Sequence, residues 1–301
     1  MRVKGDPAEV IRLFDDTRYE TGYQVAETYK EKSGVEKFDA IIIATGKNFA
    51  DALSGSYLAV VKNAPILLTN GKEDNIAELH QYMKENVNEN GTIYILGGEK
   101  AVPESVEDIE GFEVKRLSGD TRYDTNIEIL KEAGIEGDEL IVATGKTYAD
   151  SLSASALKMP ILLVKPGAAL NDEQKEIVQN FEDGIIYIIG GENAVSAEIE
   201  NELAEYYAVE RVYGDSRYET SVAVAERFFG NVDTVVLASG KNFPDGLCGG
   251  PLAAVLDAPL ILTADKKTEA AADCIGRRNI AWAYVLGGTE ALPEAAIAEI
   301  F

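Results

Sequence analysis

The chain has 301 residues, of which 46% are hydrophobic, and this is enough material for two or three domains that each bury a core. Its 52 Asp and Glu residues outnumber 28 Lys and Arg residues, which gives a formal net charge of −24. An acidic chain of this kind lacks the basic footprint of a nucleic-acid-binding protein, so we expect no nucleic acid as a partner.

The apolar runs are too short for a membrane-spanning helix, which needs roughly 20 residues. The first residues, MRVKGD, lack the apolar segment of a secretory signal. The sequence alone therefore predicts either a cytosolic chain or a mature fragment without its leader. The two cysteines, Cys248 and Cys274, do not have the spacing of a zinc site and exclude a disulfide-rich scaffold.

Short apolar runs alternate with amphipathic stretches along the first hundred residues or so. They predict strands near 10–14, 39–45, 65–69 and 92–96, and helices near 18–32, 49–62, 73–87 and 103–109. The strand Ile41-Ile42-Ile43 is apolar without alternation, which is typical of a parallel sheet covered by helices on both faces.

Four motifs of this first segment recur twice more in the same order, at a spacing of roughly 100 residues. The turn DTRYET begins at Asp16, Asp120 and Asp215, and the segment ATGKNFAD begins at Ala44, Ala143 and Ala238. The strand PILL begins at Pro65, Pro160 and Pro259, and the turn LGG begins at Leu96, Ile189 and Leu286. We therefore predict an α/β protein of three small, doubly wound domains with parallel sheets, at residues 1–111, 112–206 and 207–301. The helix after Asp150 is expected to be about one turn shorter than its counterparts.

Each repeat carries three cations at equivalent places, so nine of the 28 occupy such positions. They are Arg12, Arg116 and Arg211 before the DTRY turn; Arg18, Arg122 and Arg217 within it; and Lys47, Lys146 and Lys241 after the glycine of ATGKNFAD. The turns follow strands and lead into helices, so they should gather at the carboxyl edge of a sheet, where open α/β sheets bind ligands. Helix N-termini at this edge attract anions.

Several of these residues have two interpretations. Thr17 and Glu20 form a capping box, whereas Arg18 in the first turn opposes the helix dipole by roughly 0.3 to 1 kcal/mol. That arginine and its equivalents either pair with an acidic residue, in the same turn or in a neighbouring domain, or they bind an anion. The candidates for such structural ion pairs are Asp16, Asp120 and Asp215 in the turn, and Asp51, Asp150 and Asp245 in ATGKNFAD, which we also expect to close capping boxes with Asn48, Thr147 and Asn242.

The three repeats do not share a known catalytic or nucleotide-binding motif. His80 is the only histidine and stands in one repeat, so no His relay or His metal site can be repeated. The glycine pairs do not match G-x-G-x-x-G, and Gly145-Lys146-Thr147 lacks the first glycine of a P-loop. We expect no catalytic residue, no metal and no cofactor, although carboxylates are numerous enough for a glycosidase pair.

The motifs R-x-x-x-D-T-R-Y-x-T, A-T-G-K-x-F-A-D-A-L, P-I-L-L and I-L-G-G-E, three times over nearly the whole chain, resemble the cell wall binding repeat type 2 family. In that family, three tandem modules accompany clostridial surface-layer proteins and N-acetylmuramoyl-L-alanine amidases of Gram-positive bacteria. The resemblance implies Rossmann-like modules packed as a pseudo-threefold trimer within one monomeric chain. It also implies a non-catalytic anchor at the cell surface, held on an anionic wall polysaccharide or a teichoic-acid-like polymer.

On this hypothesis Arg18, Arg122 and Arg217 clamp phosphate or carboxylate groups. The other six cations support them, and Tyr19, Tyr123 and Tyr218 either stack on sugar rings or pack in the fold. Asp15 replaces the glycine found as Gly119 and Gly214, and Thr289 replaces a glutamate, so the three sites are not expected to be equal. Three alternatives stay open: a carbohydrate-active enzyme that uses Asp51 and its equivalents, a cytosolic nucleotide or small-ligand binder, and a structural module in which Arg-Asp pairs join the domains.

Overall fold

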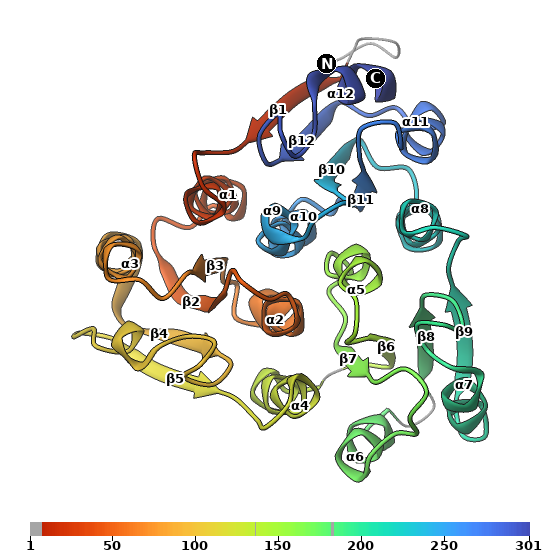
Figure 1. Cartoon of the computed structure of the whole chain (residues 1–301), viewed down its shortest axis with the longest axis horizontal. Helices are drawn as coiled ribbons and strands as arrows, with labels where there is room; N and C mark the ends of the chain where they lie inside the picture. Colours follow the sequence, from red (N-terminus) through yellow and green to blue (C-terminus); the bar gives the residue numbers. More distant parts are fainter. Residues whose placement is uncertain (1–7, 136, 182–183) are drawn as a thin grey trace.

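Three parallel four-stranded sheets surround a common centre (Figure 1). The computed structural model describes residues 8–135, 137–181 and 184–301. The first sheet has the order β3 (Ile66–Thr69), β2 (Phe38–Thr45), β4 (Val87–Leu96), β5 (Glu113–Leu117); the second β7 (Ile161–Val164), β6 (Glu139–Thr144), β8 (Ile185–Ile189), β9 (Ala208–Val212); and the third β11 (Leu260–Thr263), β10 (Thr234–Ser239), β12 (Trp282–Leu286), β1 (Glu9–Leu13). Every pairing among these strands is parallel, so the predicted α/β fold of three units is confirmed.

Helices separate the strands as the alternating pattern predicts, except between β4 and β5, where the helix expected near 103–109 is only a 3-10 turn. They are α1 (Arg18–Ser33), α2 (Ala50–Val61), α3 (Glu73–Asn86), α4 (Arg122–Ala133), α5 (Ala149–Ala154), α6 (Asp172–Gln179), α7 (Ala197–Ala204), α8 (Arg217–Phe228), α9 (Pro244–Leu247), α10 (Gly249–Val255), α11 (Glu269–Gly276) and α12 (Glu294–Ile300), with a 3-10 turn at Glu104–Val106. The central strands need this cover because Ile41, Ile42 and Ile43 are fully buried. The shorter helix expected after Asp150 is α5, with 6 residues against 12 in α2.

The first strand of each repeat belongs to the sheet of the repeat before it. Strand β5 pairs with β4, β9 pairs with β8, and β1 pairs with β12. The prediction that the strand near 10–14 lies in the sheet of the first repeat was therefore wrong: Leu13 is in register with Leu286, at the other end of the chain. Strand β1 thus completes the third sheet and lies beside β12 (Figure 1).

The first helix of each repeat joins two units. Helix α4 packs on the edge strand β7 of its own sheet and on α2 of the preceding repeat. In the same way α8 packs on β11 and α5, and α1 packs on β3 and α10. Helices α2, α5, α9 and α10 thus lie at the centre of the molecule, with α1, α4 and α8 between the units (Figure 1). This cyclic pattern is the pseudo-threefold arrangement that the sequence resemblance implies.

Close approach at these contacts depends on small side chains. A Cβ on Gly250 of α10 would clash with Oγ of Ser155, just after α5. Cys248 stands where the other repeats have Ser54 and Ser153, and its Sγ lies 3.4 Å from a Cβ placed on Gly22 of α1. Burial raises the pKa of Cys248 to about 12, which is consistent with the packed thiol expected from the sequence.

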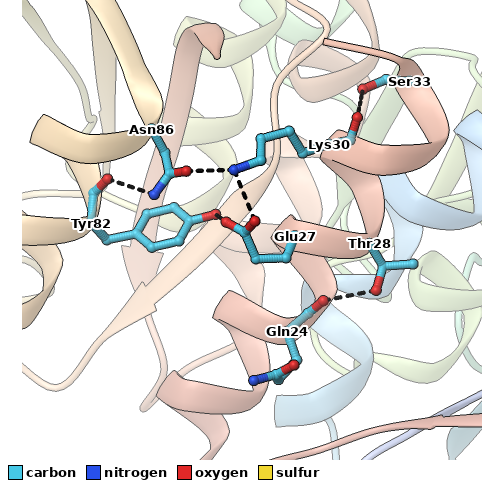
Figure 2. Close-up of polar contacts among 7 residues, drawn as sticks. All are labelled: Gln24, Glu27, Thr28, Lys30, Ser33, Tyr82 and Asn86. Atoms are coloured by element: carbon cyan, nitrogen blue, oxygen red, sulfur yellow. Dashed lines mark hydrogen bonds and ion pairs between the residues drawn. The ribbon is translucent and has the colours of Figure 1, made fainter. Parts of the chain in front are cut away.

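A polar network fixes α1 against α3 (Figure 2). Lys30 donates from Nζ to Oδ1 of Asn86 at 2.6 Å and pairs with the carboxylate of Glu27 at 2.8 Å. Tyr82 donates to the same carboxylate at 2.7 Å, and its ring stacks on Tyr23 with 4.8 Å between centroids. The contacts hold the helix whose N-terminus carries the first DTRY turn.

The closure of the ring by β1 can be tested with Leu13→Ala. Leu13 is 8% exposed, and its carbonyl accepts from the N–H of Gly287 at 2.9 Å. We expect the free energy of unfolding to fall by about 2 to 5 kcal/mol, as for other buried leucines. Hydrogen exchange of the Gly287 amide should become faster.

The matched control is Val10→Ala on the same strand, because Val10 is 41% exposed. It should change the free energy of unfolding by no more than about 0.5 kcal/mol. Equal effects of the two substitutions, with unchanged exchange at Gly287, would show that β1 does not close the third sheet.

Candidate functional site

Three kinds of turn meet at the carboxyl edge of each sheet. We call them the Gly-Lys turn (46–47, 145–146 and 240–241), the Gly-Gly turn (97–98, 190–191 and 287–288) and the Arg-Tyr turn (18–19, 122–123 and 217–218). The sequence predicts that the three kinds of turn gather at this edge, but it does not predict which repeat supplies each turn. Because β5, β9 and β1 cross into the preceding sheet, each edge combines the Gly-Lys and Gly-Gly turns of one repeat with the Arg-Tyr turn of the next.

The Arg-Tyr turn is fixed by the cap of the helix that follows it. Glu20 donates its N–H to Oγ1 of Thr17, and its carboxylate accepts from the N–H of Thr17 at 2.8 Å. This predicted capping box is also present between Thr121 and Asp124. In the third repeat only the first half is formed, from the N–H of Glu219 to Ser216 at 3.3 Å.

The arginine of each Arg-Tyr turn donates to the glycine carbonyl of the Gly-Lys turn in its own repeat. From Nη1, Arg18 reaches the oxygen of Gly46 at 3.0 Å, Arg122 that of Gly145 at 2.7 Å, and Arg217 that of Gly240 at 2.7 Å. No ion pair among the described residues joins these arginines to the aspartate two positions before them. Asp16, Asp120 and Asp215 are exposed.

The same guanidinium groups lower the pKa of a carboxyl group in the preceding repeat. Burial raises the pKa of Asp51, and the charge of Arg122 opposes this shift. Arg217 acts in the same way on Asp150, whose pKa burial raises to about 6. The third pair is Arg18 with Asp245. Each of these arginines thus interacts electrostatically with a buried carboxyl group of the preceding repeat, which is one of the partnerships that the sequence left open.

Each of these aspartates packs against the first glycine of a Gly-Gly turn. Gly97 and Gly190 have φ of +97° and +113°, and a Cβ on them would lie 2.6 and 2.7 Å from Oδ2 of Asp51 and Asp150. Only glycine fits there.

The capping role expected for these aspartates was wrong. The N-caps of α2 and α5 are Phe49 and Tyr148, without a side-chain bond. Asn48 instead accepts the N–H of Phe49 at 2.8 Å, and α2 begins at Ala50.

An aromatic triangle lies where the three Gly-Lys turns converge. The ring centroids of Phe49, Tyr148 and Phe243 are 5.6 to 6.0 Å apart. The guanidinium of Arg122 lies 5.2 Å from the centroid of Phe49, and that of Arg217 lies 5.2 Å from Tyr148. Sequence reasoning missed this cluster, although an aromatic residue two positions after each lysine of ATGKNFAD was its signal.

The lysines of the Gly-Lys turns are free of counter-ions within the described part of the chain. Their backbone N–H groups donate to Thr45, Thr144 and Ser239 at 3.1 to 3.3 Å, which fixes the turns. The side chains of Lys47, Lys146 and Lys241 are exposed, and their ammonium groups make no described hydrogen bond or ion pair.

The arginines that precede the Arg-Tyr turns are held by ion pairs and hydrogen bonds within the fold. Arg12 pairs with Glu294 at 2.8 Å and donates to the carbonyl of Gly287 at 2.9 Å. Arg211 pairs with Glu200 at 2.7 Å and donates to Gly190 at 2.8 Å. Arg116 has the same two kinds of partner, Glu107 and the carbonyl of Gly97. These three side chains support the Gly-Gly turns from within.

The tyrosines of the Arg-Tyr turns lie half-buried against the glycine of the Gly-Lys turn. A Cβ on Gly46 or Gly145 would lie 2.6 Å from Cε1 of Tyr19 or Tyr123, and the equivalent atom of Tyr218 is as close to Gly240. These rings are therefore part of the packing of the turn.

His80 lies outside the site, with Nε2 3.1 Å from the carbonyl of Val106. Among residues 8–135, 137–181 and 184–301, no three His, Cys, Asp or Glu side chains are grouped as ligands for a metal ion. No helix in the same ranges combines the length and apolar character needed to cross a membrane.

Three stretches of the chain, residues 12–107, 116–200 and 211–297, match cell wall binding domain 2 (CWB2). N-acetylmuramoyl-L-alanine amidase LytC of Bacillus subtilis is 28% identical over 291 residues, or 94% of this chain and 56% of the relative. The amidase enhancer of the same species is 29% identical over 300 residues, or 97% of this chain and 40% of the relative. The chain thus spans about half the length of these relatives.

Two solved structures from Clostridium difficile have the same fold. Cwp8 superimposes with a TM-score of 0.83 at 27% identity, covering 98% of this chain and 52% of Cwp8. Cwp6 gives a TM-score of 0.81 at 23% identity, covering 93% of this chain and 46% of Cwp6.

The buried carboxylate of Asp150 leads to a pH prediction. Its pKa rises on folding from 3.8 to about 6, so the folded state binds this proton more tightly than the unfolded chain. The carboxyl group therefore favours folding most below pH 4, and this contribution is lost as the pH rises through 6. Asp150→Asn, neutral throughout, should gain about 2 kcal/mol relative to the unsubstituted chain between pH 4 and pH 7.

Urea denaturation at the two pH values measures the difference. Asp16→Asn is the control, because Asp16 is exposed and should give no such change between pH 4 and pH 7. A difference between Asp150→Asn and the unsubstituted chain that stays constant with pH would contradict the burial of a titrating carboxyl group.

Proposed function

The chain belongs to the cell wall binding domain 2 family, and on this premise we propose that it binds an anionic wall polymer at three sites between its repeats. The modules follow the repeats at residues 1–111, 112–206 and 207–301, and each uses a strand of the next to complete its sheet. The ligand is an anionic polysaccharide or a teichoic-acid-like polymer. The chain acts as a monomer outside the cell, and it serves as the anchor rather than the enzyme.

The observation that carries this proposal is the set of three exposed lysines without counter-ions. Lys47, Lys146 and Lys241 stand at equivalent places on a chain of net charge −24. Beside each Gly-Lys turn lies an arginine whose Nη1 donates a hydrogen bond to the glycine carbonyl of that turn. Local cations of this kind give an anionic polymer a place to bind on a surface that otherwise repels it.

Three sites around one centre suit a repetitive ligand. Once one site holds a polymer, the others bind it as an intramolecular event at a high effective concentration. Each site can then be weak while retention on the wall is strong. The arginines and lysines provide the binding groups, whereas Arg12, Arg116 and Arg211 maintain the Gly-Gly turns.

The experiment is retention of a triple variant, Lys47→Ala with Lys146→Ala and Lys241→Ala, on purified cell wall. At roughly 0.5 kcal/mol for each lost exposed contact, retention should weaken about tenfold. The retention of the unsubstituted chain should also fall with added salt, and after acid extraction of the anionic polymers from the wall.

The matched control removes three exposed lysines elsewhere, with Lys32→Ala, Lys37→Ala and Lys84→Ala. It has the same net charge, so it separates position from overall charge. Equal retention of both triple variants, or equal pelleting of the unsubstituted chain with stripped wall, would contradict the proposal.

A structural role for the arginines is the second candidate, and their interactions with the carboxyl groups and aromatic rings of the preceding repeat favour it. Arg122→Ala removes a donor from the carbonyl of Gly145 and leaves Asp51 buried without its cation. We expect the free energy of unfolding to fall by about 1 to 3 kcal/mol.

Lys146→Ala provides the comparison, because it removes the same charge from the adjacent turn and should change stability by no more than about 0.5 kcal/mol. Thermal denaturation of both variants measures this. If Arg122→Ala is as stable as Lys146→Ala, the arginine does not join the units.

A further inference from the structure

We propose that two exposed aromatic side chains, Phe14 and Tyr213, receive sugar rings of the bound polymer at the third and second sheets. The inference rests on the proposed function and narrows its ligand to an anionic polysaccharide. The first sheet has no such ring and binds by charge alone.

The two rings occupy equivalent positions in the fold. Phe14 follows the last residue of β1, and Tyr213 follows the last residue of β9. They are 51% and 54% exposed, so each ring leaves apolar surface free at the carboxyl edge of its sheet. The equivalent residue after β5 is Ser118.

Each ring is supported on one side by a Gly-Gly turn. A Cβ on Gly288 would lie 3.5 Å from Cδ2 of Phe14, and one on Gly191 would lie 3.6 Å from Cδ2 of Tyr213. At Gly98, beside Ser118, no described atom comes within 4 Å of such a Cβ. The second glycine thus leaves room for an aromatic ring, and two of the three sites use that room.

An aspartate contacts the first glycine of each of these turns and interacts with an arginine of an Arg-Tyr turn. In the third sheet, the carboxylate of Asp245 contacts Gly287, and Arg18 acts on that carboxylate. In the second sheet, Asp150 contacts Gly190 and interacts with Arg217. At both sites the exposed ring therefore shares its Gly-Gly turn with a carboxylate whose pKa is lowered by the arginine of an Arg-Tyr turn.

This combination selects a ligand that is apolar on one side and anionic on another. A pyranose ring presents a face of C–H groups, which are attracted to the negative face of an aromatic ring. Its carboxylate or phosphate substituent can then reach the arginine or the exposed lysine of the Gly-Lys turn. A polyol phosphate chain satisfies the cations but has no ring to stack, so the aromatic side chains favour a charged polysaccharide.

The test compares two soluble probes by calorimetry with the full chain. One is a polysaccharide of uronic acid and N-acetylhexosamine units, and the other is poly(glycerol phosphate), which has no sugar rings. In the double variant Phe14→Ala and Tyr213→Ala, affinity for the polysaccharide should fall by about 2- to 10-fold per ring. Affinity for poly(glycerol phosphate) should not change.

The matched control is Tyr206→Ala. Tyr206 is 76% exposed and precedes β9, at the opposite end of the strand from Tyr213. It should leave both affinities unchanged. The reciprocal variant Ser118→Tyr should strengthen polysaccharide binding by a similar factor, and thermal denaturation should show that all variants remain folded.

The outcomes separate this inference from the proposed function. If the unsubstituted chain binds neither probe, both fail. If it binds the polysaccharide and the double variant binds it equally well, or loses affinity for both probes alike, the stacking role is wrong while the anionic-polymer proposal stands. Binding of poly(glycerol phosphate) alone would have the same meaning.

Discussion

The bridge made by the arginine of each Arg-Tyr turn is the interaction on which the arrangement of this protein depends. Arg122 binds the Gly145 carbonyl of one unit and offsets the buried charge of Asp51 in another. Removing either partner would leave a buried polar group uncompensated, which costs more than the bond itself contributes. Three such bridges, related by the cyclic exchange of β1, β5 and β9, set the Gly-Lys turns around one centre and so fix the distances between the candidate sites.

The bridge also explains how a structural interaction and the proposed binding surface can share residues. A guanidinium has five N–H donors in a planar fork. In Arg18 and Arg217, one nitrogen is committed to a glycine carbonyl, while the residue as a whole remains exposed. The neighbouring lysines add charge without a structural duty. A site built on a rigid scaffold of this kind has its cations positioned before the ligand arrives, which reduces the entropy lost on binding.

Most helices and strands could be predicted from the sequence, and so could the location of the turns at the carboxyl edge. Hydrophobic periodicity and apolar runs are local properties of the sequence. The partner of β1 could not, since a five-residue strand such as Glu9–Leu13 carries no sign of which sheet edge it joins. The caps of α2 and α5 were predicted from residue type alone, and Asn48 used its side chain on the adjacent N–H instead. Arg18 and Asp245, which interact electrostatically, belong to the first and third repeats, and only the closed arrangement of the units brings them together.

The closing strand has a consequence for how the protein is made. The hydrogen bond from Arg12 to Gly287 joins residues 275 positions apart, so β1 finds its place only after β12 has been synthesised. Contacts of such long range require a large loop to close before they contribute, and they slow folding. The first and second sheets take all four of their strands from consecutive segments and can assemble during synthesis. The third sheet remains open at its β12 edge until the end, and an unpaired edge is a template for misassociation. Completion of the third sheet is thus the step at which a nascent chain is most exposed to pairing with a copy of itself.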